Sequence, residues 1–180
     1  MRVPAGGAAL RCYGRPVDEA TLQRLREASG LRLDAEGRFW HQGAPVEHAR
    51  TCEVLHLGLH RAEGGRWATR IGSEWGYVAV DDAAFFVRRI EPEPLAPFAL
   101  HLWLLGGAEE SVPASGLCGG ARDALYLRLA SGERALLLRT AQLSLAPLLR
   151  EEAGGFALEL GEQRFAIGAD SGPEPVRISA

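Results

Sequence analysis

The sequence predicts an α+β fold built from two similar small units, each an antiparallel sheet with one helix, preceded by an extra N-terminal helix. Three observations lead to this prediction. Short segments in which apolar and polar residues alternate occur in both halves of the chain, as in half-buried strands. Each half contains one helical segment that paired glycines follow, Gly64-Gly65 and Gly154-Gly155. Three prolines within residues 91–97 indicate an extended connector between the two units.

Length and composition limit the chain to one compact domain or two small ones. It has 180 residues, of which 47% are hydrophobic and 24% charged, and a chain of this kind buries a sizeable core. All 20 basic residues are arginines, which indicates a compositional bias, and the net charge is −3. A weakly acidic chain does not concentrate nucleic acid or anionic lipid by its field. We therefore expect neither nucleic acid nor a membrane as a partner.

Cysteine usage and apolar segments indicate the cellular compartment. Cys12, Cys52 and Cys118 show no paired spacing, which fits a reducing compartment better than a disulfide scaffold. The N-terminus lacks the apolar core of a signal peptide, and the longest strongly apolar stretch, residues 98–105, is short and interrupted by His101. We expect a cytoplasmic protein.

Residues 1–30 form the predicted N-terminal extension. Within it, Asp18 can cap a helix over residues 17–29, and Gly30 can end that helix. The apolar stripe of this helix is thin, so we expect it to pack on the outside of the body.

Residues 31–92 form the predicted first unit. Its helix covers residues 46–62 and places Leu55 on the core face at helical spacing. The predicted strands of this unit are residues 31–33, 38–42, 66–71, 76–80 and 85–90.

Residues 93–180 form the predicted second unit. Its helix covers residues 141–152, with Thr140 as a cap and Pro147 as a residue that shortens or kinks it. Residues 106–122 are rich in Gly and Ser and predict a long loop. The predicted strands are residues 98–105, 123–130, 134–139, 156–160 and 164–167.

The order of strand, helix, double glycine and strands recurs in the two units. Gly72 and Gly161 occupy corresponding places after the double glycines. The recurrence indicates internal duplication, although two copies of so short a pattern can also arise by chance.

One set of residues matches the pattern of a known family. That pattern begins with a glycine, an aromatic strand and a helix entry similar to Gly-Ser-Pro-Ile. A glutamate follows, and then a segment with an acidic residue before Asp-Ala-Pro-Phe. The matching residues in the first unit are Gly37, Trp40, Gly43, Pro45, Glu74, Asp82, Ala83 and Phe85. Looser matches in the second unit are Tyr126, Leu127, Gly132, Ala135, Leu136 and Arg139. Over about residues 31–168 the chain thus resembles a bacterial family, domain-of-unknown-function family 1285. It departs from the pattern at His48, Ala84 and Thr140, where the family has Arg, Pro and Pro.

The resemblance implies a duplicated two-domain core, a second half similar to pleckstrin-homology barrels, and a site between the halves for a nucleotide-like ligand in signalling. It points to four ligand-binding residues. Arg139 would pair with an anionic group, Tyr126 would stack or donate a hydrogen bond, and Glu74 and Asp82 would accept hydrogen bonds from a sugar or a base. Each residue also has an ordinary explanation, as a turn carboxylate, a sheet aromatic or an exposed ion pair.

The sequence predicts no metal site, no catalytic residue and no cofactor. His48, Cys52, His56 and His60 recur every fourth residue, a spacing that allows pairs to chelate a metal. At roughly 100° per residue the series drifts by about 120°, which places His48 on the core side and His60 toward solvent. No serine lies in a nucleophile elbow, and the glycine-rich loop lacks a phosphate-gripping Lys-Ser/Thr ending.

We expect a non-enzymatic ligand-binding or regulatory module. Two alternatives of other classes stay open, an enzyme of small-molecule metabolism with an unrecognised site and a protein-interaction adaptor. A site assembled only in three dimensions would leave no trace in the sequence.

Overall fold

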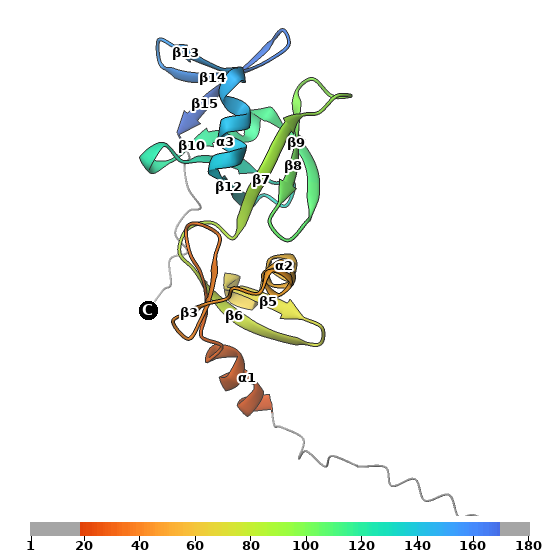
Figure 1. Ribbon diagram of the computed structural model, residues 1–180, viewed down its shortest axis with the longest axis vertical. Helices are drawn as coiled ribbons and strands as arrows, with labels where there is room; N and C mark the ends of the chain where they lie inside the picture. Colours follow the sequence, from red (N-terminus) through yellow and green to blue (C-terminus); the bar gives the residue numbers. More distant parts are fainter. Residues whose placement is uncertain (1–18, 170–180) are drawn as a thin grey trace, which may run out of the picture.

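The computed structural model describes residues 19–169 and has a mixed α+β fold in which sheets predominate. Figure 1 shows two bodies along the long axis, with α1 at the end furthest from the second body. We call residues 19–80 the first half and residues 85–169 the second half. No helix in the described residues has the length and apolar character that crossing a bilayer requires.

The first half is a six-stranded sheet with the order β3-β2-β1-β6-β5-β4. Its elements are α1 (Glu19–Glu27), β1 (Leu31–Leu33), β2 (Phe39–His41), β3 (Ala44–Pro45), α2 (Ala49–Leu57), β4 (His60–Arg61), β5 (Trp67–Ile71) and β6 (Glu74–Val80). Strands β1 and β6 pair in parallel, and the other neighbours are antiparallel. The N-terminal helix is thus present, next to β6.

Helix α2 supplies the core of the first half. Leu55 is 2% exposed and packs with Leu33, Phe39 and Val78, as helical spacing predicts. The helix is shorter than the predicted residues 46–62. It ends at Gly58, where a Cβ atom would lie 2.2 Å from the carbonyl oxygen of Arg70. The next residues leave the helix to pair with β5 as β4.

The second half is a nine-stranded sheet with the order β13-β14-β15-β10-β11-β12-β7-β8-β9. Its elements are β7 (Phe85–Pro92), β8 (Ala99–Leu104), β9 (Glu109–Pro113), β10 (Leu117–Gly119), β11 (Leu125–Arg128), β12 (Arg134–Leu137), α3 (Arg139–Leu145), β13 (Leu149–Glu152), β14 (Gly155–Leu160) and β15 (Gln163–Ala169). Two pairs, β10 with β15 and β7 with β12, are parallel, so both sheets of the molecule are mixed and not antiparallel as predicted. Helix α3 packs mainly on β7, and its Ala141 and Leu145 are fully buried.

The two halves share one topology. In the first half three strands (β1, β2, β3) precede α2 and three (β4, β5, β6) follow it, and the last strand pairs in parallel with the first. The second half repeats this order with β10 to β12, α3 and β13 to β15. Gly72 and Gly161 turn the corresponding hairpins with φ of 62° and 61°. Strands β7, β8 and β9 extend the second sheet beyond the shared part.

Two sequence predictions for the second half differ from the structure. Residues 106–122 contain β9 and β10 rather than one long loop, because β9 pairs with β8 and β10 pairs with β11. The helix predicted over residues 141–152 ends at Leu145, and Pro147 lies in a following 3-10 turn. Residues 149–152 then form β13, because they pair with β14.

The chain crosses between the sheets at residues 81–84, not at residues 91–97. Strand β7 pairs with β8 and β12, so it belongs to the second sheet. The proline-rich segment is the loop of the β7–β8 hairpin, closed by a hydrogen bond from the Glu93 N–H to the Ala99 carbonyl. The predicted boundary at residue 92 therefore does not coincide with the change of sheet.

A shared core joins the two halves. Leu33 and Leu55 of the first half pack in one cluster with Phe86 and Tyr126 of the second. The loop after β8 lies against α2, where a Cβ atom on Gly106 would come within 2.8 Å of the His56 Cβ. This loop can approach so closely only because Gly106 has no side chain and adopts a φ of 89°.

Candidate functional site

Asp82 and Tyr126, two of the four predicted ligand residues, lie in direct contact. The Tyr126 hydroxyl donates to Asp82 Oδ2 at 2.6 Å, and Arg134 Nη2 donates to Asp82 Oδ1 at 2.7 Å. The Arg134 guanidinium also lies 4.5 Å from the centre of the Tyr126 ring. Both oxygens of the carboxylate thus bind protein groups, and this triad ties the crossing segment to the second sheet.

Arg134 was missed by sequence reasoning. It stands opposite Arg128 at the end of the β11–β12 hairpin, in a chain with 20 basic residues, all arginines. No motif distinguishes it from the others. The crossing at residues 81–84 brings Asp82 to the second sheet and so gives Arg134 an acidic partner.

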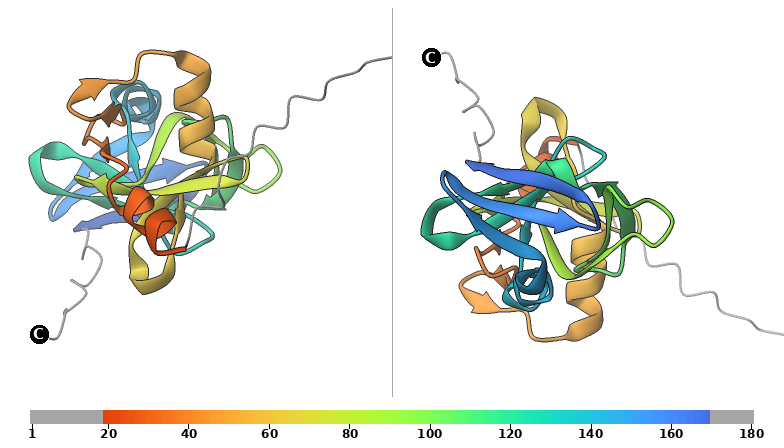
Figure 2. Two further views of the ribbon diagram at one scale, coloured as in Figure 1. Left: turned by 90° about the horizontal axis from the view of Figure 1, so that it is seen from below. Right: turned by 90° about the horizontal axis from the view of Figure 1, so that it is seen from above.

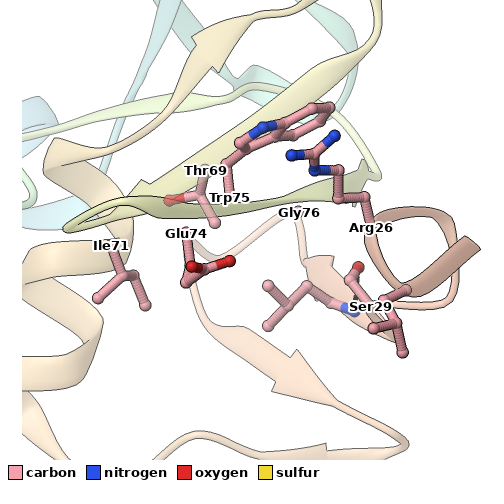
Figure 3. A pocket seen from close by; sticks show the side chains of 9 residues that line it. Arg26, Ser29, Thr69, Ile71, Glu74, Trp75 and Gly76 are labelled. Atoms are coloured by element: carbon pink, nitrogen blue, oxygen red, sulfur yellow. Dashed lines mark hydrogen bonds between the residues drawn. The ribbon is translucent and has the colours of Figure 1, made fainter. Parts of the chain in front are cut away.

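Glu74 lies apart from this triad. It begins β6 and lines a cavity of about 260 Å³ between α1 and the first sheet. Figure 3 shows its carboxylate beside Ile71 and below Thr69, with Arg26 and Trp75 stacked at the other side of the cavity. Glu74 is exposed, and its carboxylate accepts a hydrogen bond from the Ser73 hydroxyl at 3.4 Å.

Arg139 lies in the second half. It is the first residue of α3, is exposed, and forms no hydrogen bond or ion pair with the residues that the structure describes. It lines a cavity of about 620 Å³ that shares no lining residue with the cavity at Glu74. The structure therefore brings together two of the four predicted residues and leaves the other two in separate cavities.

The cavity at Arg139 lies between α3 and the parallel pair β10–β15, and we call it the seam cavity. Its floor includes Gly119 of β10 with Ile167 and Ala169 of β15. One wall is α3, with Arg139 and Leu143. Seen from above, α3 lies beside the strands β14 and β15 rather than across them (Figure 2, right).

The seam cavity exists because small residues stand where the first half has large ones. The last residue pair of the parallel seam is Leu33 with Val80 in the first half and Gly119 with Ala169 in the second. Leu33 is fully buried and packs with Leu55 of α2. Gly119 has no side chain to fill the equivalent space under α3, which leaves it open.

Polar groups in the seam cavity are few. Its lining residues include one basic side chain, Arg139, and one acidic side chain, Asp123, from the loop between β10 and β11. Gln142 Nε2 donates to the Leu137 carbonyl at 2.9 Å, so part of this amide is already bound. Such a cavity can hold an apolar molecule and orient it through one or two polar contacts.

Comparison with solved structures finds two proteins of similar fold. No protein-family model matches the chain, and no curated protein matches it. A DUF1285 family protein from Silicibacter pomeroyi DSS-3 has a TM-score of 0.59 and 21% identity, over 77% of this chain and 79% of that chain. A DUF1285 family protein from Shewanella baltica OS155 has a TM-score of 0.53 and 18% identity, over 66% of this chain and 91% of that chain. The chain has the DUF1285 fold.

The resemblance noted in the sequence is thus confirmed at the level of the fold. Identities of 18% and 21% carry over the DUF1285 fold and not an activity.

His48 and His56, at the start of α2 and within it, have separate structural roles in the DUF1285 fold. His48 is exposed and accepts a hydrogen bond from the Thr51 N–H as the helix cap, although the sequence placed it on the core side. His56 is buried instead, and its Nε2 donates to the Gly37 carbonyl at 3.1 Å. Among residues 19–169, no three His, Cys, Asp or Glu side chains are grouped to hold a metal ion.

Proposed function

We propose that this protein is a non-enzymatic ligand-binding module that holds a small molecule in the seam cavity. The observation that carries this proposal is the cavity itself. Its volume of about 620 Å³ lies within the range of ligand sites, roughly 300–1,000 Å³. A mostly apolar lining with a few polar groups is also typical of such sites.

The seam cavity is a better candidate than the region between the halves. At that junction the Asp82 carboxylate is bound by Tyr126 and Arg134, and Trp67 packs edge-on against Phe85 at 5.6 Å. A ligand there would have to displace these contacts. Of the four predicted ligand residues, Arg139 is the one that lines the proposed site.

Further expectations about this module stay predictions. The resemblance implies a nucleotide-like ligand, a role in signalling, a second half of the pleckstrin-homology type and a bacterial source. Cysteine usage predicts a cytoplasmic location, and the recurring pattern of the two units predicts internal duplication. The shared topology of the two halves supports duplication.

Thermal unfolding in the presence of a broad panel of metabolites, nucleotides included, tests the proposal. The variant Gly119→Leu places a leucine side chain on the cavity floor, at the position that corresponds to Leu33 in the first half. An added Cβ at Gly119 makes only ordinary contacts, the nearest at 3.9 Å, so the fold should accept the change. We expect a compound that raises the Tm of the wild type to leave the Tm of Gly119→Leu unchanged.

Gly154→Leu is the matched control. Gly154 has no neighbour within 4 Å of an added Cβ and does not line the cavity, so this variant should respond like the wild type. If no compound stabilises the wild type, or if Gly119→Leu responds equally, the protein does not bind ligands in the seam cavity.

A further inference from the structure

We infer that the ligand of the seam cavity is an amphipathic anion, with an apolar body and a single anionic group that binds Arg139. This inference rests on the ligand site proposed above and specifies its chemistry. It follows from the apolar surface of the cavity, from the unpaired charge at its wall and from the small number of other polar groups.

Large apolar side chains surround the space above the seam. Leu125 and Ile167 stand next to the Gly119 floor, and Leu149 begins the strand after α3. Leu143 and Phe156 also line the cavity and are 61% and 56% exposed. An apolar ligand body would remove part of this surface from water, which is the main source of affinity in such sites.

Arg139 provides the charge for the other end of the ligand. It is the only basic residue among the described lining residues, and no carboxylate of the described chain pairs with it. A guanidinium binds a carboxylate through two parallel hydrogen bonds and keeps its charge at any physiological pH. The lining holds a single acidic residue, Asp123, in the loop between β10 and β11, and among the described residues no ion pair joins it to Arg139.

The same set of groups disfavours a nucleotide. A nucleotide brings a phosphate, a sugar and a base edge, each of which needs hydrogen-bond partners when it leaves water. Beyond Arg139, the side chains able to donate or accept in the cavity are Gln142 and Asp123, and the Gln142 Nε2 already donates to Leu137. Asp123 repels any anion in the cavity, and the repulsion is stronger for a phosphate that carries close to two charges than for a carboxylate that carries one. An anion with one charged group leaves fewer buried polar groups without partners.

The size of the cavity sets the size of the apolar body. A water molecule occupies about 30 Å³ of liquid, so about 620 Å³ corresponds to roughly twenty non-hydrogen atoms. Medium-chain carboxylates fit within this limit, and decanoate is a soluble probe of the class.

Isothermal titration calorimetry on the full chain tests the inference with decanoate, octanoate, decanol and decylamine. We expect decanoate to bind, and octanoate to bind more weakly by about fourfold for each methylene removed. Decanol and decylamine should bind at least about tenfold more weakly than decanoate, because neither forms a charged pair with Arg139.

Two variants separate the charged contact from general apolar binding. Arg139→Gln should weaken decanoate binding by about tenfold to a hundredfold and leave the weak binding of decanol unchanged. The control is Arg50→Gln on α2, an exposed arginine that also lacks a partner among the described residues and lies outside the cavity lining. It should bind decanoate like the wild type.

The outcomes distinguish this inference from the proposal on which it rests. Equal affinity for decanol and decanoate, or unchanged affinity of Arg139→Gln, would overturn the inference. Nucleotide binding that Gly119→Leu abolishes, with no decanoate binding, would also overturn it but would leave the proposed ligand module in place. If no compound of either class binds, both fail.

Discussion

His56 is a titratable side chain placed where the two halves of the molecule meet. Its ring contacts Phe39 at 4.8 Å and Phe86 at 6.2 Å between centroids, both edge-on, and it donates to the Gly37 carbonyl. Burial lowers the pKa of His56, and the hydrogen bond to Gly37 only partly offsets this effect. The folded protein therefore favours the neutral ring.

We expect the free energy of unfolding to fall as the pH is lowered from 7.5 to 5. Since the pKa of His56 is lower in the folded state than its unfolded value of about 6.5, the unfolded state takes up the proton first. The stabilisation is complete above that value and is lost as the pH falls toward the folded pKa. Urea unfolding at several pH values measures the fall, which one proton limits to about 1.4 kcal/mol per pH unit.

The variant His56→Gln is the comparison for this titration. Glutamine is neutral and keeps a donor for the Gly37 carbonyl, so the variant should show a smaller fall over the same pH range. An identical pH dependence in both proteins would assign the effect to other groups.

Single-residue contacts were the part of the candidate site that the sequence predicted least well. Apolar residues at helical spacing predicted α2, but the side that packs inward was assigned to His48 instead of His56. His60, predicted on the same helix, lies in β4. The side of α2 that packs inward depends on the approach of Gly106, which belongs to the other half. Gly106 lies 50 residues after His56 in the chain. Arg134 escaped prediction for the same reason, because its partner Asp82 comes from the crossing segment.

Helix α2 is the element on which the first half depends. Leu55→Ala should lower the free energy of unfolding by about 2–5 kcal/mol, because it empties a site that is 2% exposed. Urea unfolding measures the loss. The control is Leu57→Ala on the same helix, which is 60% exposed and should change stability by no more than about 0.5 kcal/mol. Similar losses for both variants would mean that α2 does not pack through Leu55.

Most strands could be predicted from local patterns, whereas helix ends could not. Alternation placed β1, β6, β14 and β15 correctly within a few residues. The helices predicted for the two units, α2 and α3, were too long. The segments that come after them, β4 and β13, form strands only by pairing with later segments. Helical spacing continues past the end of α2 at Gly58, whereas Pro147 correctly indicated a shortened α3, which ends at Leu145.

The whole molecule has two sheets but one continuous interface, and we expect it to unfold in a single transition. The core cluster around Leu33 contains Phe86 and Tyr126, and Arg61 and Glu133 join the halves through an ion pair at 2.8 Å. Loss of either half would expose this shared apolar surface. The tryptophans of the described residues allow the test, since Trp103 is in the second half and the other three are in the first.

In the variant Trp103→Phe, fluorescence reports only on the first half, while far-ultraviolet circular dichroism reports on both. We expect the two signals to give the same urea midpoint. Separate midpoints would show that the halves unfold independently and that the shared core contributes little.

The order of the strands also bears on the solubility of the protein. A sheet that ends in a long, flat, apolar strand invites the sheets of other molecules to add to it. Both edges of the first sheet, β3 and β4, are only two residues long. At the edges of the second sheet, β13 has the sequence LREE and β9 the sequence EESVP, so acidic side chains or a proline interrupt each of them. All four open edges of these sheets are therefore poor templates for aggregation.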